Sequence, residues 1–394
     1  MRICHVTPHL PPDQAANALL PFHLGWWSRE AGDEVTYLAH PPRLAATDSH
    51  ARPGSTPQLA GPVTWIPVQP RRNGLGQRLK LGSLIVALRI ARQAGPLVAA
   101  VDLVHVHSNG LLAEIAALLA VRARKPVVLT LYGTEIWHYQ PRRWQPDLFT
   151  RAYRAATHVT FYSQGLQARA TELGLARPET SVIYPPVAED FRQQDTWSRA
   201  AGRAALGLHS RHVLVNVKRL HPLAGQRYLI EAVGEVIRHH PDTRLVICGT
   251  GPLLDELRDV ARAAGVEAHV IFRGLVDNRT VSLYDAVADA FVLPSLLEAC
   301  PTVALEALAC GTPVISSDNP GGVELSDLFG LDVQIVPREN ALALADAITD
   351  LLDAKRRVRP ATTELIEREF RPPSVARRFF AVYRRALDAT GRGA

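Results

Sequence analysis

The chain has 394 residues, of which 47% are hydrophobic and 21% are charged, and this composition excludes a disordered, fibrous or low-complexity protein. Its length suits two domains of ordinary size. The formal net charge of +6 favours association with phosphates, acidic lipid or nucleic acid. However, the sequence has no helix-turn-helix pattern and no aromatic-and-basic module. We therefore expect no nucleic-acid partner.

The amino-terminal residues MRICHVTPHLPPDQ lack the basic stretch and apolar core of a signal peptide, so they are expected to form a first strand. No window holds about 18 uninterrupted apolar residues, because Arg89 interrupts the best candidate, LGSLIVALRIA. These observations predict a cytoplasmic protein that does not span a membrane. Cys4, Cys248 and Cys310 lie in or beside apolar patterns without zinc spacing, which predicts reduced, buried side chains.

In the first half of the chain, short runs rich in Val and Ile alternate with segments of helical period. The runs predict buried strands at residues 2–7, 34–39, 63–68, 101–107, 126–132, 158–162 and 181–185. Helices are expected between most of them. This alternation is typical of an open α/β domain with a mostly parallel sheet.

A polar stretch at residues 188–203 separates this series from a second one. The second series predicts strands at residues 212–218, 243–249, 269–274, 289–295, 312–317 and 331–337. We expect two doubly wound α/β domains, at residues 1–192 and 193–370, with ligands bound at the carboxyl ends of their strands in a cleft between them. Residues 371–394 carry apolar side chains at helical spacing (Val375, Phe379, Val382 and Ala386), which predicts a final amphipathic helix.

One apolar segment, PSLLEACPTVALEALACGTPVI at residues 294–315, retains two glutamates. Pro301 is expected at the start of a helix that runs to Cys310, so that Glu298 lies in the preceding loop and Glu306 in the second helical turn. Unpaired N–H groups at the helix start favour a phosphate, and carboxylates can accept hydrogen bonds from sugar hydroxyls. By their spacing alone, two such glutamates are more often solvated surface residues or caps of the helix.

The segment resembles the E-x7-E segment of the family-4 retaining glycosyltransferases of GT-B fold, from Leu293 through LEALACGTPV to Gly321 and Gly322. In that family the first glutamate faces the donor sugar and the second holds the ribose. The resemblance therefore assigns these roles to Glu298 and Glu306. Further donor contacts are expected around the helix start, at Cys300, Pro301, Thr302 and Val303.

The stretch VNVKRLHPLAGQRYLIEA resembles the family's G-R-L-x-x-x-K-G phosphate motif and implies that Arg219 binds the donor diphosphate. Two positions depart from the motif, since Lys218 replaces its glycine and Ala224 replaces its lysine. The loss of one charge-assisted partner removes on the order of 1.5 to 3 kcal/mol. Lys218 or Arg227 could supply the missing charge, and the alternative is that Lys218 only projects into solvent.

Two other stretches of the second half resemble donor-binding parts of the family. Gly249 and Gly251 in CGTGP match a glycine pair that lets the backbone approach the donor, although such a pair can also form a plain tight turn. Arg273 and Gly274 in IFRG match the strand end that faces the nucleobase. These residues do not identify the base, and a UDP or GDP sugar is the expected donor.

In the first half, VHVHSNG and LTLYGTEIWH resemble the strand ends that face the donor sugar and the acceptor. The residues expected there are His107, Tyr132, Gly133, Thr134 and Glu135. His105 and His107 project from the same face of one strand, but no third ligand stands at metal spacing and the chain has no D-x-D. We therefore expect no metal site. Tyr132 replaces a family histidine and is a poor base near neutral pH, so no histidine-dependent step is carried over.

The first loop, VTPHLPPDQAANALLP, occupies the place of the family's Gly-Gly loop, yet no glycine lies between Met1 and Gly25. Candidates for acceptor contact in this loop are Asp13, Gln14 and Asn17, and a solvated loop is the alternative. Four basic residues beside an apolar helix suit peripheral contact with anionic lipid at the inner membrane face, with a solvated loop again as the alternative. These residues are Arg71, Arg72, Arg78 and Lys80.

The resemblance implies transfer of a sugar from a nucleotide diphosphate sugar to an acceptor hydroxyl, with the anomeric configuration retained. The acceptor would be a glycan, a glycolipid or a secondary metabolite. Glu298, Arg219 and Lys218 form the expected catalytic set, with the two cations neutralising the leaving diphosphate in place of a metal. A sugar phosphorylase of the same fold and a non-catalytic nucleotide- or sugar-binding protein remain open. The last helix is expected to return to the first domain.

Overall fold

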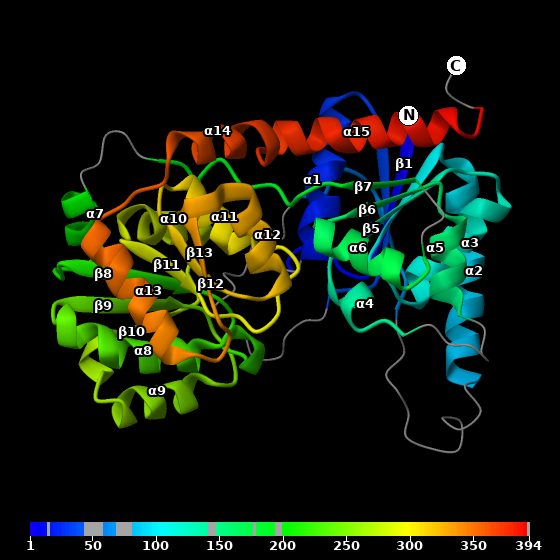
Figure 1. Cartoon of the computed structure of the whole chain (residues 1–394). Helices are drawn as coiled ribbons and strands as arrows, with labels where there is room; N and C mark the ends of the chain where they lie inside the picture. Colours follow the sequence, from blue (N-terminus) through cyan, green and yellow to red (C-terminus); the bar gives the residue numbers. More distant parts are fainter. Residues whose placement is uncertain are drawn as a thin grey trace. The chain divides into compact units, whose positions relative to one another are not determined.

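The computed structural model describes residues 1–13, 16–42, 58–67, 81–140, 147–175, 179–193 and 199–391. Contacts divide the chain into two compact units. Unit 1 comprises Met1–Ile183 and Ala376–Ala394, and unit 2 comprises Tyr184–Val375. Each unit contains one parallel sheet flanked by helices (Figure 1).

The sheet of unit 1 has seven parallel strands in the order β3-β2-β1-β4-β5-β6-β7. The strands are β1 (Arg2–Thr7), β2 (Glu34–Ala39), β3 (Val63–Trp65), β4 (Leu103–His107), β5 (Val127–Leu131), β6 (His158–Phe161) and β7 (Glu179–Val182). Each of them overlaps a predicted strand. The last one ends earlier than expected, because Pro185 and Pro186 follow it and proline has no N–H to donate to a sheet.

The helices of unit 1 are α1 (Ala16–Glu30), α2 (Leu81–Ala100), α3 (Leu111–Arg122), α4 (Thr134–Trp137), α5 (Leu148–Ala155), α6 (Gln164–Glu172) and most of α15 (Pro372–Asp388). The predicted amphipathic character of α15 is confirmed. Val375, Phe379, Val382 and Ala386 are each at most 1% exposed. Among the helices that the structure describes, none has the length and apolar character needed to cross a bilayer.

The sheet of unit 2 has six parallel strands in the order β10-β9-β8-β11-β12-β13. The strands are β8 (His212–Val217), β9 (Thr243–Cys248), β10 (Val270–Gly274), β11 (Ala290–Leu293), β12 (Val314–Ser317) and β13 (Val333–Val336). The helices are α7 (Arg199–Ala205), α8 (Gln226–His239), α9 (Leu254–Ala263), α10 (Asn278–Val287), α11 (Thr302–Ala309), α12 (Pro320–Phe329), α13 (Ala341–Ala354) and α14 (Pro360–Glu369).

In both sheets the strand order changes direction at one point, between β1 and β4 in unit 1 and between β8 and β11 in unit 2. Ligands of open α/β sheets bind at the carboxyl ends of the strands at such a switch point. In unit 2 this point lies between the loops that carry Arg219 and Glu298.

The chain enters and leaves unit 2 along neighbouring segments. The Val187 N–H donates to the Phe370 carbonyl over 2.8 Å, and the rings of Tyr184 and Phe370 stack with centroids 5.1 Å apart. The two ends of unit 2 are therefore held together by its own contacts.

Candidate functional site

Backbone hydrogen bonds join the loops that follow β8, β9 and β10. They run from Lys218 N to Cys248 O (3.0 Å), from Leu220 N to Thr250 O (3.0 Å) and from Gly249 N to Gly274 O (2.7 Å). A Cβ atom on Gly249 would lie 2.0 Å from the Lys218 carbonyl oxygen, and one on Gly251 would lie 2.2 Å from that of Leu220. Only glycine allows so close an approach. The glycine pair therefore packs against the loop that carries Arg219.

The loop after β11 lies against the loop after β8. The Leu296 N–H donates to the Leu223 carbonyl over 2.8 Å. Gly225 has a left-handed φ of 67°, and a Cβ on it would lie 2.1 Å from the Pro294 carbonyl oxygen. Sequence reasoning assigned Gly225 no role, although it is the final glycine of the phosphate motif quoted above. Its absence of a side chain lets the two loops meet.

Lys218 and Glu298 form an ion pair where these loops meet. The Lys218 Nζ lies 2.5 Å from the Glu298 Oε1, with the side chains 30% and 11% exposed. The Gly321 N–H donates to the Glu298 carbonyl over 3.0 Å and so fixes the backbone of that loop. Lys218 therefore does more than project into solvent, since its ammonium group neutralises the glutamate.

The other cations considered for the phosphate motif differ in their surroundings. Arg219 is exposed, and it forms no ion pair with any residue in the described ranges. The Arg227 Nε lies 2.9 Å from the Glu231 Oε1 one turn along α8, and this partner raises the pKa of Arg227. Ala224, at the position of the motif's lysine, is 3% exposed. Arg219 is thus the cation of this loop that is open to an incoming anion.

The helix expected around Glu306 is confirmed. It is α11, which begins at Thr302 with Pro301 as its N-cap and has Glu306 in its second turn. Burial raises the pKa of Glu306 to about 8. A carboxyl group that keeps its proton at neutral pH can donate one hydrogen bond and accept another.

Asp285 on α10 is a second buried carboxyl group close to Glu306. It is fully buried, and burial together with the charge of Glu306 raises its pKa well above the ordinary range. Sequence reasoning missed Asp285, because its proximity to Glu306 arises from the packing of α10 against α11. The two carboxyls share one desolvated region, where a second negative charge is unfavourable.

The expected nucleobase residues lie at the end of β10. The Arg273 guanidinium carbon lies 5.9 Å from the centroid of the Tyr284 ring, and its Nη2 donates to the Leu206 carbonyl over 3.3 Å. Gly274 has a left-handed φ of 69° with open space around its Cα. Cys300 and Val303 are half-buried beside the start of α11.

In unit 1, β1 and β4 bring three histidines together. His5, His105 and His107 offer ligand atoms within 4.8 Å of one another, and all three are fully buried. The expectation that no third ligand stands at metal spacing is therefore wrong, because β1 pairs with β4 and aligns His5 with His105. Burial lowers the pKa of each, that of His5 to about 3.

The ring nitrogens of this cluster are mostly occupied by hydrogen bonds. The contacts are His5 Nδ1 to His107 Nε2 (3.0 Å), His107 Nδ1 to Tyr132 Oη (2.7 Å), His105 Nδ1 to Tyr383 Oη (2.7 Å) and His105 Nε2 to Thr130 Oγ1 (2.7 Å). A metal ion would have to displace several of these bonds. In this structure the cluster forms a buried hydrogen-bonded network, and both ring nitrogens of His107 take part in it.

The turn after β5 is held by Glu135. This residue is 5% exposed and its Oε2 accepts from the Gly133 N–H over 2.8 Å, while its Oε1 accepts from the Tyr132 N–H over 3.4 Å. Glu135 therefore shapes the loop from within. Tyr132 is half-buried with its hydroxyl on His107, and the side chain of Thr134 lies outside the described part of the structure.

The remaining candidates of unit 1 are only partly described. Asp13 accepts from the His9 Nδ1 over 2.9 Å. The Asn17 Oδ1 is buried and has no hydrogen-bond partner among the described residues. Gln14 and the basic residues Arg71, Arg72, Arg78 and Lys80 lie outside the described ranges.

Two family models match the chain, and together they span most of it. Residues 199–367 match the model described as Glycosyl transferases group 1, and residues 22–191 match that of Glycosyltransferase Family 4. Their boundary falls near the boundary between units 1 and 2.

Curated relatives and solved structures are similar to both units. The GDP-mannose-dependent alpha-(1-6)-phosphatidylinositol monomannoside mannosyltransferase of Mycolicibacterium smegmatis is 33% identical over 253 residues, which is 61% of this chain and 65% of that protein. The glycogen synthase of Mycobacterium tuberculosis is 33% identical over 278 residues, 67% of this chain and 64% of that protein. The match thus spans less than two thirds of each relative. The structure of Anabaena HepE in complex with UDP aligns with a TM-score of 0.74 and 19% identity, covering 97% of this chain and 99% of that one.

Proposed function

Because the chain belongs to glycosyltransferase family 4, whose members have two Rossmann-like domains in the GT-B fold, we propose that it is a retaining, nucleotide-sugar-dependent hexosyltransferase. The reaction moves a sugar from a nucleotide diphosphate sugar to an acceptor hydroxyl. The observation that carries this proposal is the Lys218–Glu298 ion pair beside the exposed Arg219, at the switch point of the sheet of unit 2.

Unit 2 supplies a set of groups suited to a nucleoside diphosphate. Arg219 and Lys218 provide the charge that a diphosphate needs, and the N–H groups at the start of α11 can donate hydrogen bonds to an anion. Glu306, protonated at neutral pH, offers a donor and an acceptor to the ribose hydroxyls. The glycine pair Gly249 and Gly251 keeps the neighbouring backbone close to this set.

The chemical contribution of this set is electrostatic. As the bond between the sugar and the diphosphate breaks, negative charge grows on the leaving oxygen, and fixed cations that face it lower the barrier. Release of Lys218 from Glu298 would free both groups, the ammonium for the diphosphate and the carboxylate for the donor sugar. We assign no protein nucleophile. We propose that no metal ion is required, which predicts unchanged turnover after dialysis against a chelator.

The donor and acceptor classes follow from the family and the relatives. The name of the smegmatis relative specifies GDP-mannose and a glycolipid, and HepE was solved with UDP. We therefore propose a UDP or GDP sugar as donor and a glycan, glycolipid or secondary metabolite as acceptor. In unit 1, Tyr132, Gly133, Thr134 and Asn17 remain candidates for acceptor contact.

The first test is thermal unfolding of the purified chain with UDP, GDP, ADP and dTDP and with their sugars. A nucleotide at 100 times its Kd should stabilise the protein by about 2.7 kcal/mol, and Arg219→Ala should remove that shift. Stabilisation by one nucleotide, with turnover of its sugar, supports the proposal. Stabilisation without turnover on any acceptor would indicate a binding protein. Phosphate-dependent turnover without a nucleotide would indicate a sugar phosphorylase.

A further inference from the structure

A cationic pocket lies at the amino ends of the strands of unit 2. It has a volume of about 220 Å³. Arg211 precedes β8, and Asp289 precedes β11. The pocket is closed from the end of α13 by Leu351, Leu352, Lys355 and Arg356. Because all strands of this sheet are parallel, the pocket lies at the opposite edge of the sheet from Arg219 and Glu298.

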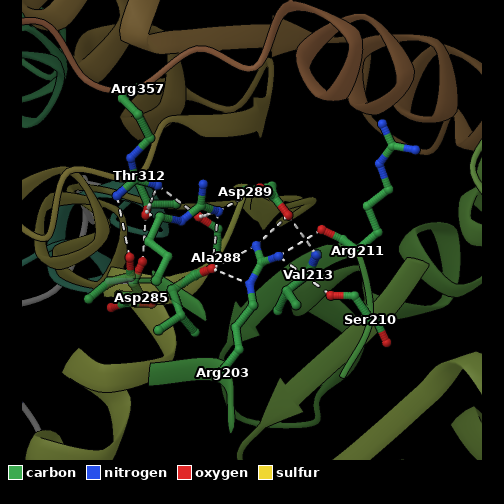
Figure 2. Close-up of polar contacts among 12 residues, drawn as sticks. Arg203, Ser210, Arg211, Val213, Asp285, Ala288, Asp289, Thr312 and Arg357 are labelled. Carbon is green, nitrogen blue, oxygen red and sulfur yellow. Dashed lines mark hydrogen bonds and ion pairs between the residues drawn. The ribbon is translucent and has the colours of Figure 1, made fainter. Parts of the chain in front are cut away.

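Two arginines of α7 form the base of the pocket. Asp289 accepts from the Arg199 Nη2 over 2.5 Å and from the Arg203 Nη2 over 2.7 Å. Arg203 also donates to the carbonyl of Val287, and its Nη1 donates to that of Arg211 over 2.7 Å. Figure 2 shows Arg203 between Asp289 and the loop of Ser210 and Arg211, with the Arg211 side chain extending away from that contact. The base is therefore fixed before any ligand arrives.

Three further cations surround the opening. Arg211, Lys355 and Arg356 are exposed and line the pocket, and none of them forms an ion pair within the described part of the chain. The lining thus contains five cationic side chains and one carboxylate. His212 adds no charge at neutral pH, because burial lowers its pKa. Arg199 and Arg203 share Asp289, so the positive charges exceed the negative ones in the lining, and a bound anion would lower the repulsion among them.

Two residues that line the pocket, Lys355 and Arg199, each have an unfavourable local feature. Lys355 has a left-handed φ of 49° at the end of α13, a position where glycine is preferred and other residues are strained. The Arg199 Nε is buried and lacks a hydrogen-bond partner among the described residues. A buried donor without a partner is unfavourable, and a bound anion could supply the missing acceptor.

We propose that this pocket binds a small phosphate-bearing anion of the size of pyrophosphate or a sugar phosphate, as a second anion site separate from the donor-binding edge. Guanidinium groups bind phosphate oxygens in pairs, and Arg199, Arg211 and Arg356 line the same pocket. The volume is smaller than the roughly 300 to 1,000 Å³ of pockets for drug-sized ligands, which favours a compact ligand. The proposal does not depend on the transfer reaction.

The test is calorimetric titration with pyrophosphate. The background protein carries Lys218→Ala and Arg219→Ala, so that the cations at the carboxyl ends of the strands cannot bind the ligand. In this background the chain should bind one pyrophosphate. The further triple change of Arg211, Lys355 and Arg356 to Ala should weaken binding at least tenfold. A matched control removes three exposed arginines of unit 2 outside the pocket (Arg238, Arg258 and Arg279) and should leave the Kd within about twofold. One decade of Kd corresponds to about 1.4 kcal/mol.

A single substitution separates binding from folding. Lys355→Gly relieves the left-handed strain and should raise the unfolding temperature, yet it should weaken pyrophosphate binding several-fold because one cation is lost. Equal affinity in the background and in both pocket variants would overturn the proposal. An equal loss in the control would overturn it as well, because binding would then reflect only net charge.

A vesicle experiment distinguishes a free phosphate compound from a lipid headgroup. The background protein is mixed with vesicles of phosphatidylcholine, with and without phosphatidylglycerol. Retention of pyrophosphate binding with no pocket-dependent vesicle binding supports the proposal. If the triple variant loses vesicle binding and the background never binds pyrophosphate, the pocket is a lipid contact and the proposal is overturned.

Discussion

The ammonium group of Lys218 lies 2.5 Å from the carboxylate of Glu298, although the two residues belong to different loops. Their strands, β8 and β11, are neighbours at the switch point of the sheet. Both side chains are largely withdrawn from solvent, so removal of one partner leaves a partly buried charge uncompensated. The pair therefore links the loop after β8 to the loop before α11.

Glu298→Ala is expected to lower the rate of sugar transfer at least about 100-fold, as loss of a group that acts on the transition state does. Steady-state rates with the donor identified by unfolding would measure this. The control is Glu231→Ala, which breaks the exposed Arg227–Glu231 pair and should change the rate less than twofold. Comparable rates in the two variants would show that Glu298 does not contribute to sugar transfer.

Gly225→Ala should unfold the chain at lower denaturant concentration than Gly265→Ala. The two glycines have left-handed φ values of 67° and 69°, but only a Cβ on Gly225 would meet backbone, at 2.1 Å from the Pro294 carbonyl oxygen. Gly265→Ala should cost roughly 1 to 2 kcal/mol from its backbone conformation alone. Gly225→Ala should cost roughly 1 to 3 kcal/mol more because two loops must separate. Equal costs would show that the loops are not in tight contact.

Glu306→Gln should make the pH dependence of stability flatter. The pKa of Glu306 is about 8 in the folded protein against 4.5 for an unperturbed glutamate. The unfolded chain therefore loses this proton first, and the wild-type protein loses stability as pH rises from about 4.5 to about 8. The variant should equal the wild type below this window and exceed its free energy of unfolding above it. Denaturant titrations at several pH values measure the difference, with Glu256→Gln on the exposed face of α9 as the control.

Tyr383→Phe should destabilise unit 1. The Tyr383 hydroxyl lies 2.7 Å from the His105 Nδ1 in a fully buried contact, and a buried polar group left without its partner costs roughly 1 to 3 kcal/mol. Tyr228→Phe, which removes an exposed hydrogen bond to Glu339, should cost less than about 0.5 kcal/mol. Urea unfolding of both variants checks this, and a cost for Tyr383→Phe no larger than the control would argue against the histidine network.

The strands and the helix of the E-x7-E segment could be predicted from sequence for a physical reason. Strands buried on both faces form continuous apolar runs. Such runs can be recognised in the sequence without knowing which strands lie beside them. The start of α11 could likewise be predicted from Pro301 and from the spacing of the apolar residues that follow it. Such features are encoded within a few residues.

Features that depend on strand order were not predictable. His5 joins His105 and His107 only because β1 lies next to β4, and Lys218 meets Glu298 only because β8 lies next to β11. Asp285 lies near Glu306 through helix packing. The cationic pocket combines α7, the start of β8 and the end of α13. No local sequence pattern connects these three segments.

The division of the chain has a consequence for how such proteins can change. Tyr184–Val375 interrupts the sequence of the other unit as one continuous insertion, and its first and last segments are clasped by the Val187–Phe370 hydrogen bond. An inserted domain whose two ends lie close together can be exchanged as a whole without a change in the chain path of the domain that contains it. Under the proposed function, replacement of this one block would exchange the donor-contacting loops, while the host sheet keeps its histidine network.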